Sequence, residues 1–180
     1  MNRTVRRHRA RIAAVLGLAC AIGVVATPVS AAKGDKLTAV VDGKKLKLRN
    51  KTLCAGYNTA VISIAGGTKF HHLGQVLRAI AVECDVDLTT AALPVSPAVC
   101  SITYTEQGTS LHHPTSKGWA GVSTPDNPVI QVTISSFDGG RVRGTFSGTL
   151  AGETTGTPAT TVRGTFSVTA VLNGSNCTPV

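Results

Sequence analysis

Aromatic residues are scarce in this chain: they make up 4% of its 180 residues and include a single tryptophan. A hydrophobic core must therefore be built mostly from Val, Ile, Leu and Ala. The chain also lacks a convincing helix, because its apolar residues rarely recur at helical spacing. What recurs is alternation of apolar and polar residues, the pattern of half-buried β-strands.

Catalytic signatures are missing as well. The sequence contains no GxSxG, SxxK or HExxH motif. Ser147 falls on the polar face of an expected strand, and nothing in the sequence assigns it a base. We therefore expect a non-catalytic protein without a cofactor; a hydrolase is a rival that would need Ser, His and Asp to converge.

The clearest positive feature is a hexapeptide, VRGTFS, that occurs at residues 142–147 and again at 162–167. Both copies alternate, so we expect two strands with Phe146 and Phe166 paired in the core. Gly144 and Gly164 fall on the inward face, where close packing favours the absence of a side chain. Together with short alternating segments and frequent turns, the pattern predicts an all-β fold, a single antiparallel β-sandwich of about seven to nine strands.

The N-terminus has the pattern of an export signal. Five arginines precede an apolar run at residues 12–26, which is too short to span a bilayer comfortably, and Ser30-Ala31-Ala32 supplies small residues for cleavage. We predict a cleaved signal peptide at residues 1–32 and one secreted or cell-envelope domain at 33–180, without a transmembrane helix. Lipidation at Cys20 is the alternative, disfavoured because Gly17 stands where a lipobox has Leu, Val or Ile.

Net charge argues against a nucleic-acid binder. Of the 18 Lys and Arg, five belong to the signal, which leaves 13 against nine acids, a net charge of +4. Such a mildly basic domain lacks the charge expected of a dedicated nucleic-acid-binding protein.

The expected mature domain has four cysteines, an even number that indicates two disulfides in an exported chain. Three connectivities are open, and the sequence alone does not choose among them. Our preferred pairing is Cys84–Cys100 as the local bridge and Cys54–Cys177 as the long one. Four buried free thiols are the alternative.

A basic ribbon follows the Asp42-Gly43 turn. In an extended strand, four cations share one face above Leu46 and Leu48: Lys45, Lys47, Arg49 and Lys51. The plain interpretation is an edge strand whose lysines prevent aggregation. The functional alternative is contact with an anionic polymer or with lipid head groups.

A long polar loop is expected at residues 107–127. It carries His112, His113 and Trp119, and loops of this length are often functional. We expect these residues to form a surface for a cell-surface or envelope component, with Trp119 as anchor; the alternative is that Trp119 folds back onto the sandwich. His112 and His113, with the pair His71 and His72, are also weak candidates for a metal or small-ligand site.

Two stretches resemble known envelope proteins. Residues 40–67, with their "VVDG" hairpin, Cys54 and "ISIAGG" strand, resemble small mycobacterial surface lipoprotein antigens, and residues 143–177 are similar to them in order. This resemblance implies an extracytoplasmic β-sandwich displayed to other cells, with a bridge like Cys54–Cys177. Residues 132–150, containing "GTFSGTL", resemble a domain of unknown function in exported bacterial lipoproteins.

Overall fold

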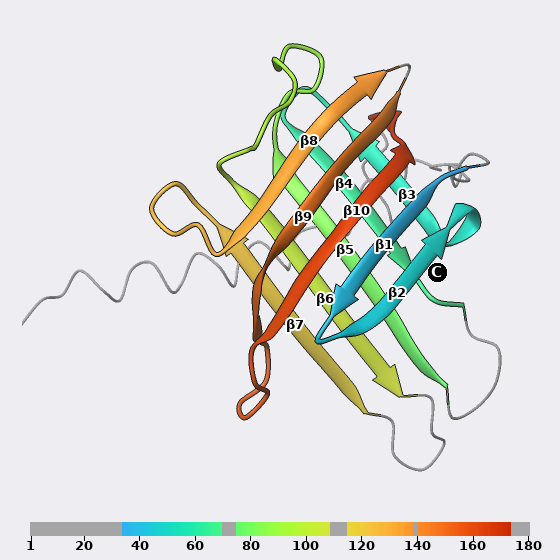
Figure 1. Cartoon of the computed structure of the whole chain (residues 1–180), viewed down its shortest axis with the longest axis vertical. Coiled ribbons are helices and arrows are strands. Elements are labelled where there is room, and N and C mark those ends of the chain that lie inside the picture. Colours follow the sequence, from blue (N-terminus) through green and yellow to red (C-terminus); the bar gives the residue numbers. More distant parts are fainter. Residues whose placement is uncertain (1–33, 70–74, 109–114, 139, 174–180) are drawn as a thin grey trace, which may run out of the picture.

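The computed structural model describes residues 34–69, 75–108, 115–138 and 140–173 (Figure 1). In this part of the chain eleven strands form one sheet, and a short 3-10 turn, η1 (Asn50–Thr52), joins β2 to β3. Neighbouring strands are antiparallel except for β11 and β3, which are parallel. The predicted all-β class is confirmed.

The sheet has two halves, which cross in front of one another in Figure 1. The first half-sheet has the strand order β8-β9-β10-β1-β2, and the second has the order β7-β6-β5-β4-β3-β11. The strands of the first are β8 (Ile130–Asp138), β9 (Arg141–Gly152), β10 (Thr160–Thr169), β1 (Lys36–Val41) and β2 (Lys44–Arg49). Those of the second are β7 (Ser116–Ser123), β6 (Cys100–Gly108), β5 (Val76–Asp85), β4 (Val61–Gly67), β3 (Leu53–Tyr57) and β11 (Val171–Leu172).

Strand β9 connects the two halves. Most of its twelve residues pair with β8 and β10, but Ala151 and Gly152 at its end pair with Ala120 and Trp119 of β7. The predicted count of seven to nine strands is wrong, because the described residues form eleven, and the two layers are parts of one sheet rather than two separate sheets. Because one strand is long enough to belong to both halves, the architecture is a single curled sheet of eleven strands.

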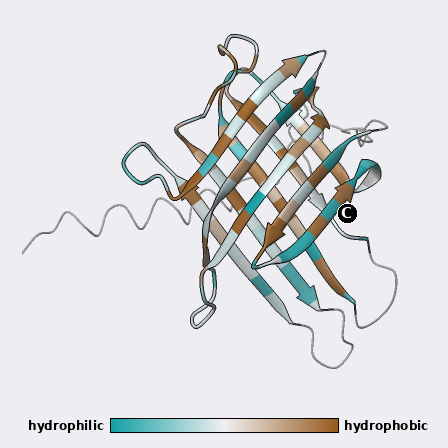
Figure 2. Cartoon of the chain, in the orientation of Figure 1, coloured by the Kyte–Doolittle hydropathy of each residue, from teal (hydrophilic) through white to brown (hydrophobic). Residues whose placement is uncertain are grey.

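The core lies between the two halves and is formed by alternate residues of the strands, a pattern visible as alternating bands in Figure 2. Its most deeply buried side chains are aliphatic, as the scarcity of aromatic residues predicted. Phe146 and Phe166 both lie in it, with ring centroids 6.5 Å apart and nearly parallel planes, so their expected pairing is confirmed.

The two VRGTFS copies form adjacent antiparallel strands in which each phenylalanine faces a glycine of the other copy. Phe146 lies opposite Gly164, and Phe166 lies opposite Gly144. A Cβ atom at either glycine would meet the ring of the opposite phenylalanine. The inward glycines are therefore required by the rings, as their position in the alternating pattern indicated.

The local disulfide is confirmed: Cys84 and Cys100 are directly opposite in the β5–β6 pair and are bonded. Cys54 is disulfide-bonded as well. Cys177, the partner predicted for it, lies outside the described residues, so the Cys54–Cys177 pairing stays a prediction. The structure is thus that of a disulfide-stabilised all-β domain.

The prediction of a long loop at residues 107–127 is wrong. Strand β6 continues to Gly108, and residues 116–123 form β7, which pairs with β6 through eight residues. Close packing explains why β7 has little apolar alternation. A Cβ atom at Gly121 would meet Leu150 and Ile130, so the sequence there reads as small and polar although it forms a strand.

Candidate functional site: a basic face on the first half-sheet

The outward side of the first half-sheet gathers positive charge from four strands. Lys45, Lys47 and Arg49 share the exposed side of β2 while Leu46 and Leu48 are buried, so this much of the basic ribbon is confirmed. The side chain of Lys51 lies outside the described residues. Three further exposed cations join from neighbouring strands. We call the whole set the basic face: Lys36, Lys45, Lys47, Arg49, Arg143 and Arg163.

Acidic residues stand at the two ends of this half-sheet: Asp35 and Asp138 at one end, and Asp42 and Glu153 in the turns at the other. Asp138 lies opposite Arg141 at the end of β8, and the Asp35 carboxylate is 3.2 Å from the Arg141 guanidinium. Among the described residues the ion pairs are Arg141–Asp35 and Arg78–Glu106, so the six cations of the basic face have no ion-pair partner there. Their charge therefore faces solvent.

Like charges even stand directly opposite one another. Lys36 of β1 is the cross-strand neighbour of Arg49 on β2, and both side chains are exposed. Side chains directly opposite are about 5 Å apart at Cβ, where like charges repel and destabilise the pair. A bound anion would remove this repulsion, so the arrangement favours an anionic ligand.

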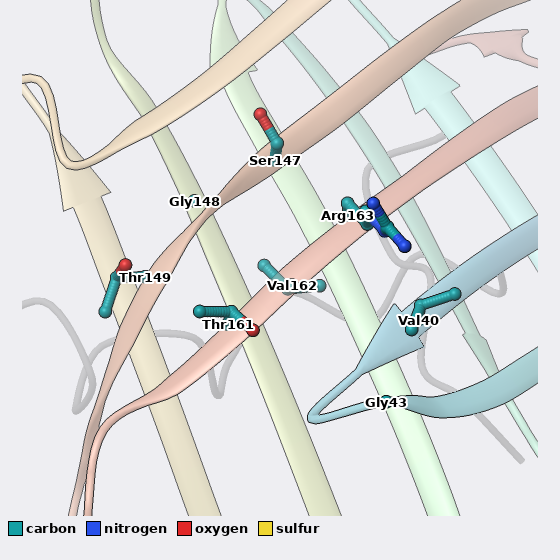
Figure 3. Close-up of a pocket in the computed structure, with 8 residues that line it drawn as sticks. All are labelled: Val40, Gly43, Ser147, Gly148, Thr149, Thr161, Val162 and Arg163. Carbon is teal, nitrogen blue, oxygen red and sulfur yellow. The ribbon is translucent and has the colours of Figure 1, made fainter.

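A shallow depression lies in the basic face, around Arg163. Figure 3 shows Arg163 on β10 between β9, which carries Ser147, and β1, which carries Val40. A second depression shares Val40 and Arg163 and is also lined by Lys45. The surface hollows coincide with the cations, although Arg163 and Lys45 are 118 positions apart in the numbering.

Hydroxyl groups form a row through the middle of the basic face. Four threonines on adjacent strands are cross-strand neighbours in turn, and we call them the threonine row: Thr38, Thr165, Thr145 and Thr133. The hydroxyls of Thr38 and Thr165 are hydrogen-bonded at 2.8 Å, and Thr133 is 3.1 Å from the Ser96 hydroxyl. Each hydroxyl is both a donor and an acceptor, so the row offers donors for anionic oxygens between the cations.

Trp119 occupies a different place from the one predicted. It lies on β7 rather than in a loop, is half-buried against the core, and packs on Tyr104 with ring centroids 5.5 Å apart. Its indole Nε1 donates to the Pro158 carbonyl at 3.0 Å. The other members of that predicted surface, His112 and His113, lie outside the described residues, as do His71 and His72.

Beside Trp119, a polar cluster lies on the inward side of the second half-sheet. The Glu106 carboxylate accepts from the Tyr104 hydroxyl at 2.7 Å and from the Arg78 guanidinium at 3.0 Å. Burial opposes the charge of Glu106, but these two hydrogen bonds outweigh it and leave the pKa of Glu106 below its ordinary value. Burial, reinforced by Glu106, raises the pKa of Tyr104, so the phenol stays protonated. The cluster is internally satisfied, and we assign it a structural role.

Neither a metal-binding cluster nor a membrane-spanning helix is found in the part of the chain that the structure describes. It holds no group of three or more His, Cys, Asp or Glu residues that could bind a metal ion. None of its helical segments has the length and apolarity needed to cross a membrane.

Comparison with protein-family models, curated proteins and solved structures finds no match for the chain.

Sequence reasoning found half of the basic face. The ribbon on β2 could be recognised because its cations alternate within one segment. Lys36, Arg143 and Arg163 were missed, since each is an ordinary polar position of its own strand. Their outward direction was predictable from alternation, but the sheet order that brings them beside β2 was not.

Proposed function

We propose that this chain is a non-catalytic, extracytoplasmic interaction module that binds an anionic partner through the basic face. The observation that carries the proposal is six exposed cations on four adjacent strands, without an ion-pair partner among the described residues. An edge strand that only needs protection from aggregation requires charge on β2. It does not require Arg143 and Arg163 on strands inside the sheet.

Two features support the extracytoplasmic part of the proposal. The Cys84–Cys100 disulfide is of a kind that persists in oxidising compartments. The N-terminal residues have the charge and hydropathy pattern of an export signal. The resemblance to mycobacterial surface antigens points the same way and extends the proposal to display at the cell surface.

The non-catalytic part rests on the surroundings of the exposed hydroxyls. Ser147 lies between Arg163 and Gln131 in the sheet register, and neither residue is a suitable base. The serine is positioned to bind an anion together with Arg163 rather than to act as a nucleophile.

The test compares two charge-removal variants of equal net charge. Lys47→Gln/Arg163→Gln removes two cations of the basic face. Lys69→Gln/Lys117→Gln removes two exposed cations away from it, one just after β4 and one on β7. Binding to long-chain polyphosphate and to anionic vesicles is measured by titration at low and moderate salt. We expect the first variant to lose most of the affinity and the second to retain it. Equal losses in both variants would show that net charge alone attracts the probes, and absence of binding by the unmodified protein would refute the proposal.

A further inference from the structure

Resting on the proposed function, we propose that the partner is a linear, phosphate-bearing polymer that lies across the strands along the threonine row. The row crosses the first half-sheet perpendicular to β1, β10, β9 and β8. Lys47 of β2 is the cross-strand neighbour of Thr38, so a cation lies at the β2 end of the row. The row is therefore a continuous polar path rather than an isolated site.

Cations flank the threonine row on both sides. On one side, Arg163 is followed across β1 by Lys45 of β2. On the other side, Ser167 lies between Lys36 and Arg143 in the register. Residues two apart on a strand are separated by about 6.7 Å, so each flanking line runs within reach of a chain lying on the threonines. Such a path between two lines of positive charge fits an extended polyanion.

A membrane surface fits this face less well. The exposed large hydrophobic side chains of the described residues lie outside β1, β2, β9 and β10. Val40 is the apolar residue among the cations, and it is half-buried. Peripheral binding to membranes normally combines charge with apolar groups that enter the lipid, and the basic face offers none of the latter.

Single-stranded nucleic acid fits less well for a related reason. Proteins that bind it place aromatic rings under successive bases. Phe146 and Phe166, the aromatic residues of β9 and β10, are buried on the inward side. The face offers contacts to charge and hydroxyl groups alone, which suits a polymer recognised by its backbone.

The geometry also sets a minimum ligand length. The cations extend from β2 to β9, three strand spacings apart, which is about 14 Å. A short anion reaches one or two of them, whereas a longer chain reaches all of them in one binding event. Affinity should therefore rise steeply with chain length until the path is filled, by roughly tenfold or more.

Chain length and two variants test the inference. Orthophosphate, tripolyphosphate, long-chain polyphosphate and anionic phospholipid vesicles are titrated into the full mature chain by calorimetry. Thr145→Val/Thr165→Val removes two hydroxyls from the row, and its control Thr103→Val/Thr105→Val removes two exposed hydroxyls from β6 on the second half-sheet. Arg143→Gln tests the direction, because a polymer lying along β2 alone would not touch it.

We expect long polyphosphate to bind at least about tenfold more tightly than tripolyphosphate. The threonine-row variant and Arg143→Gln should each weaken that binding several-fold, and the β6 control should not. Binding that is independent of length, insensitive to both variants or stronger to vesicles would overturn the linear-polymer inference. The proposed function would survive that outcome if binding still depended on Lys47 and Arg163. Loss of that dependence would overturn both.

Discussion

Phe146 lies directly opposite Gly164 across the β9–β10 pair, and its ring occupies the space that a side chain at Gly164 would need. A Cβ atom there would also meet the backbone oxygen of Thr38 on β1. The same arrangement recurs between Phe166 and Gly144, so the sequence repeat creates two reciprocal ring-on-glycine contacts. These contacts lie on the inward side of β9 and β10, the strands whose outward side carries Arg143 and Arg163.

Gly164→Ala should therefore destabilise the protein by about 1–3 kcal/mol, because the added methyl group overpacks a site bounded by backbone. Urea unfolding measures the change, with the exposed Ser147→Ala as the control on the neighbouring strand. Unchanged stability in Gly164→Ala would mean that the ring and the backbone move apart at little cost.

Removal of the local disulfide should be costly. Cys84→Ala/Cys100→Ala opens a bridge between residues 16 positions apart. The chain-entropy relation assigns about 3 kcal/mol to a loop of this size. Thermal unfolding of both proteins without reductant checks the value, and a loss of less than about 1 kcal/mol would show that the β5–β6 pairing alone supplies the constraint.

Asp35 should stabilise the start of β1 by holding it to Thr169 and Arg141. Its Oδ1 atom accepts from the Thr169 backbone N–H and hydroxyl and pairs with Arg141, although the residue is 2% exposed. Asp35→Ala leaves the partly buried Arg141 without its carboxylate, and we expect a loss of roughly 2–4 kcal/mol. The exposed Asp126→Ala is the control and should change stability by less than about 0.5 kcal/mol. Similarly small losses of stability in both variants would contradict this stabilising role of Asp35.

The Glu106 cluster gives a pH dependence. Because hydrogen bonds hold the pKa of Glu106 in the folded state below its unfolded value, the unfolded chain binds the proton more tightly. Glu106 therefore contributes to the stability of the folded state. This contribution is complete above the unfolded pKa of Glu106, about 4.3, and is lost as pH falls through its folded pKa. Glu106→Gln should therefore lose less stability than the unmodified protein between about pH 5 and pH 3. Parallel pH profiles from urea unfolding would rule out this role for Glu106.

Alternation within a segment predicted a large part of the fold. It placed Phe146 and Phe166 inward and Arg143 outward, and it identified the β2 ribbon, because side-chain direction in a strand depends only on local position. It failed at β7, where small residues accommodate neighbours, and it could not show that β9 pairs in both halves of the sheet. Pairing between distant strands depends on the whole chain, and so the complete basic face emerged only from the structure.

An NMR titration can locate an anionic polymer on the outward side of the first half-sheet. Backbone amide shifts of the protein are followed as long-chain polyphosphate is added. We predict that the largest changes occur on β1, β2, β9 and β10, around Thr38, Lys47, Arg143 and Arg163. Changes confined to β3 through β7, or the absence of changes at saturating polyphosphate, would contradict the account.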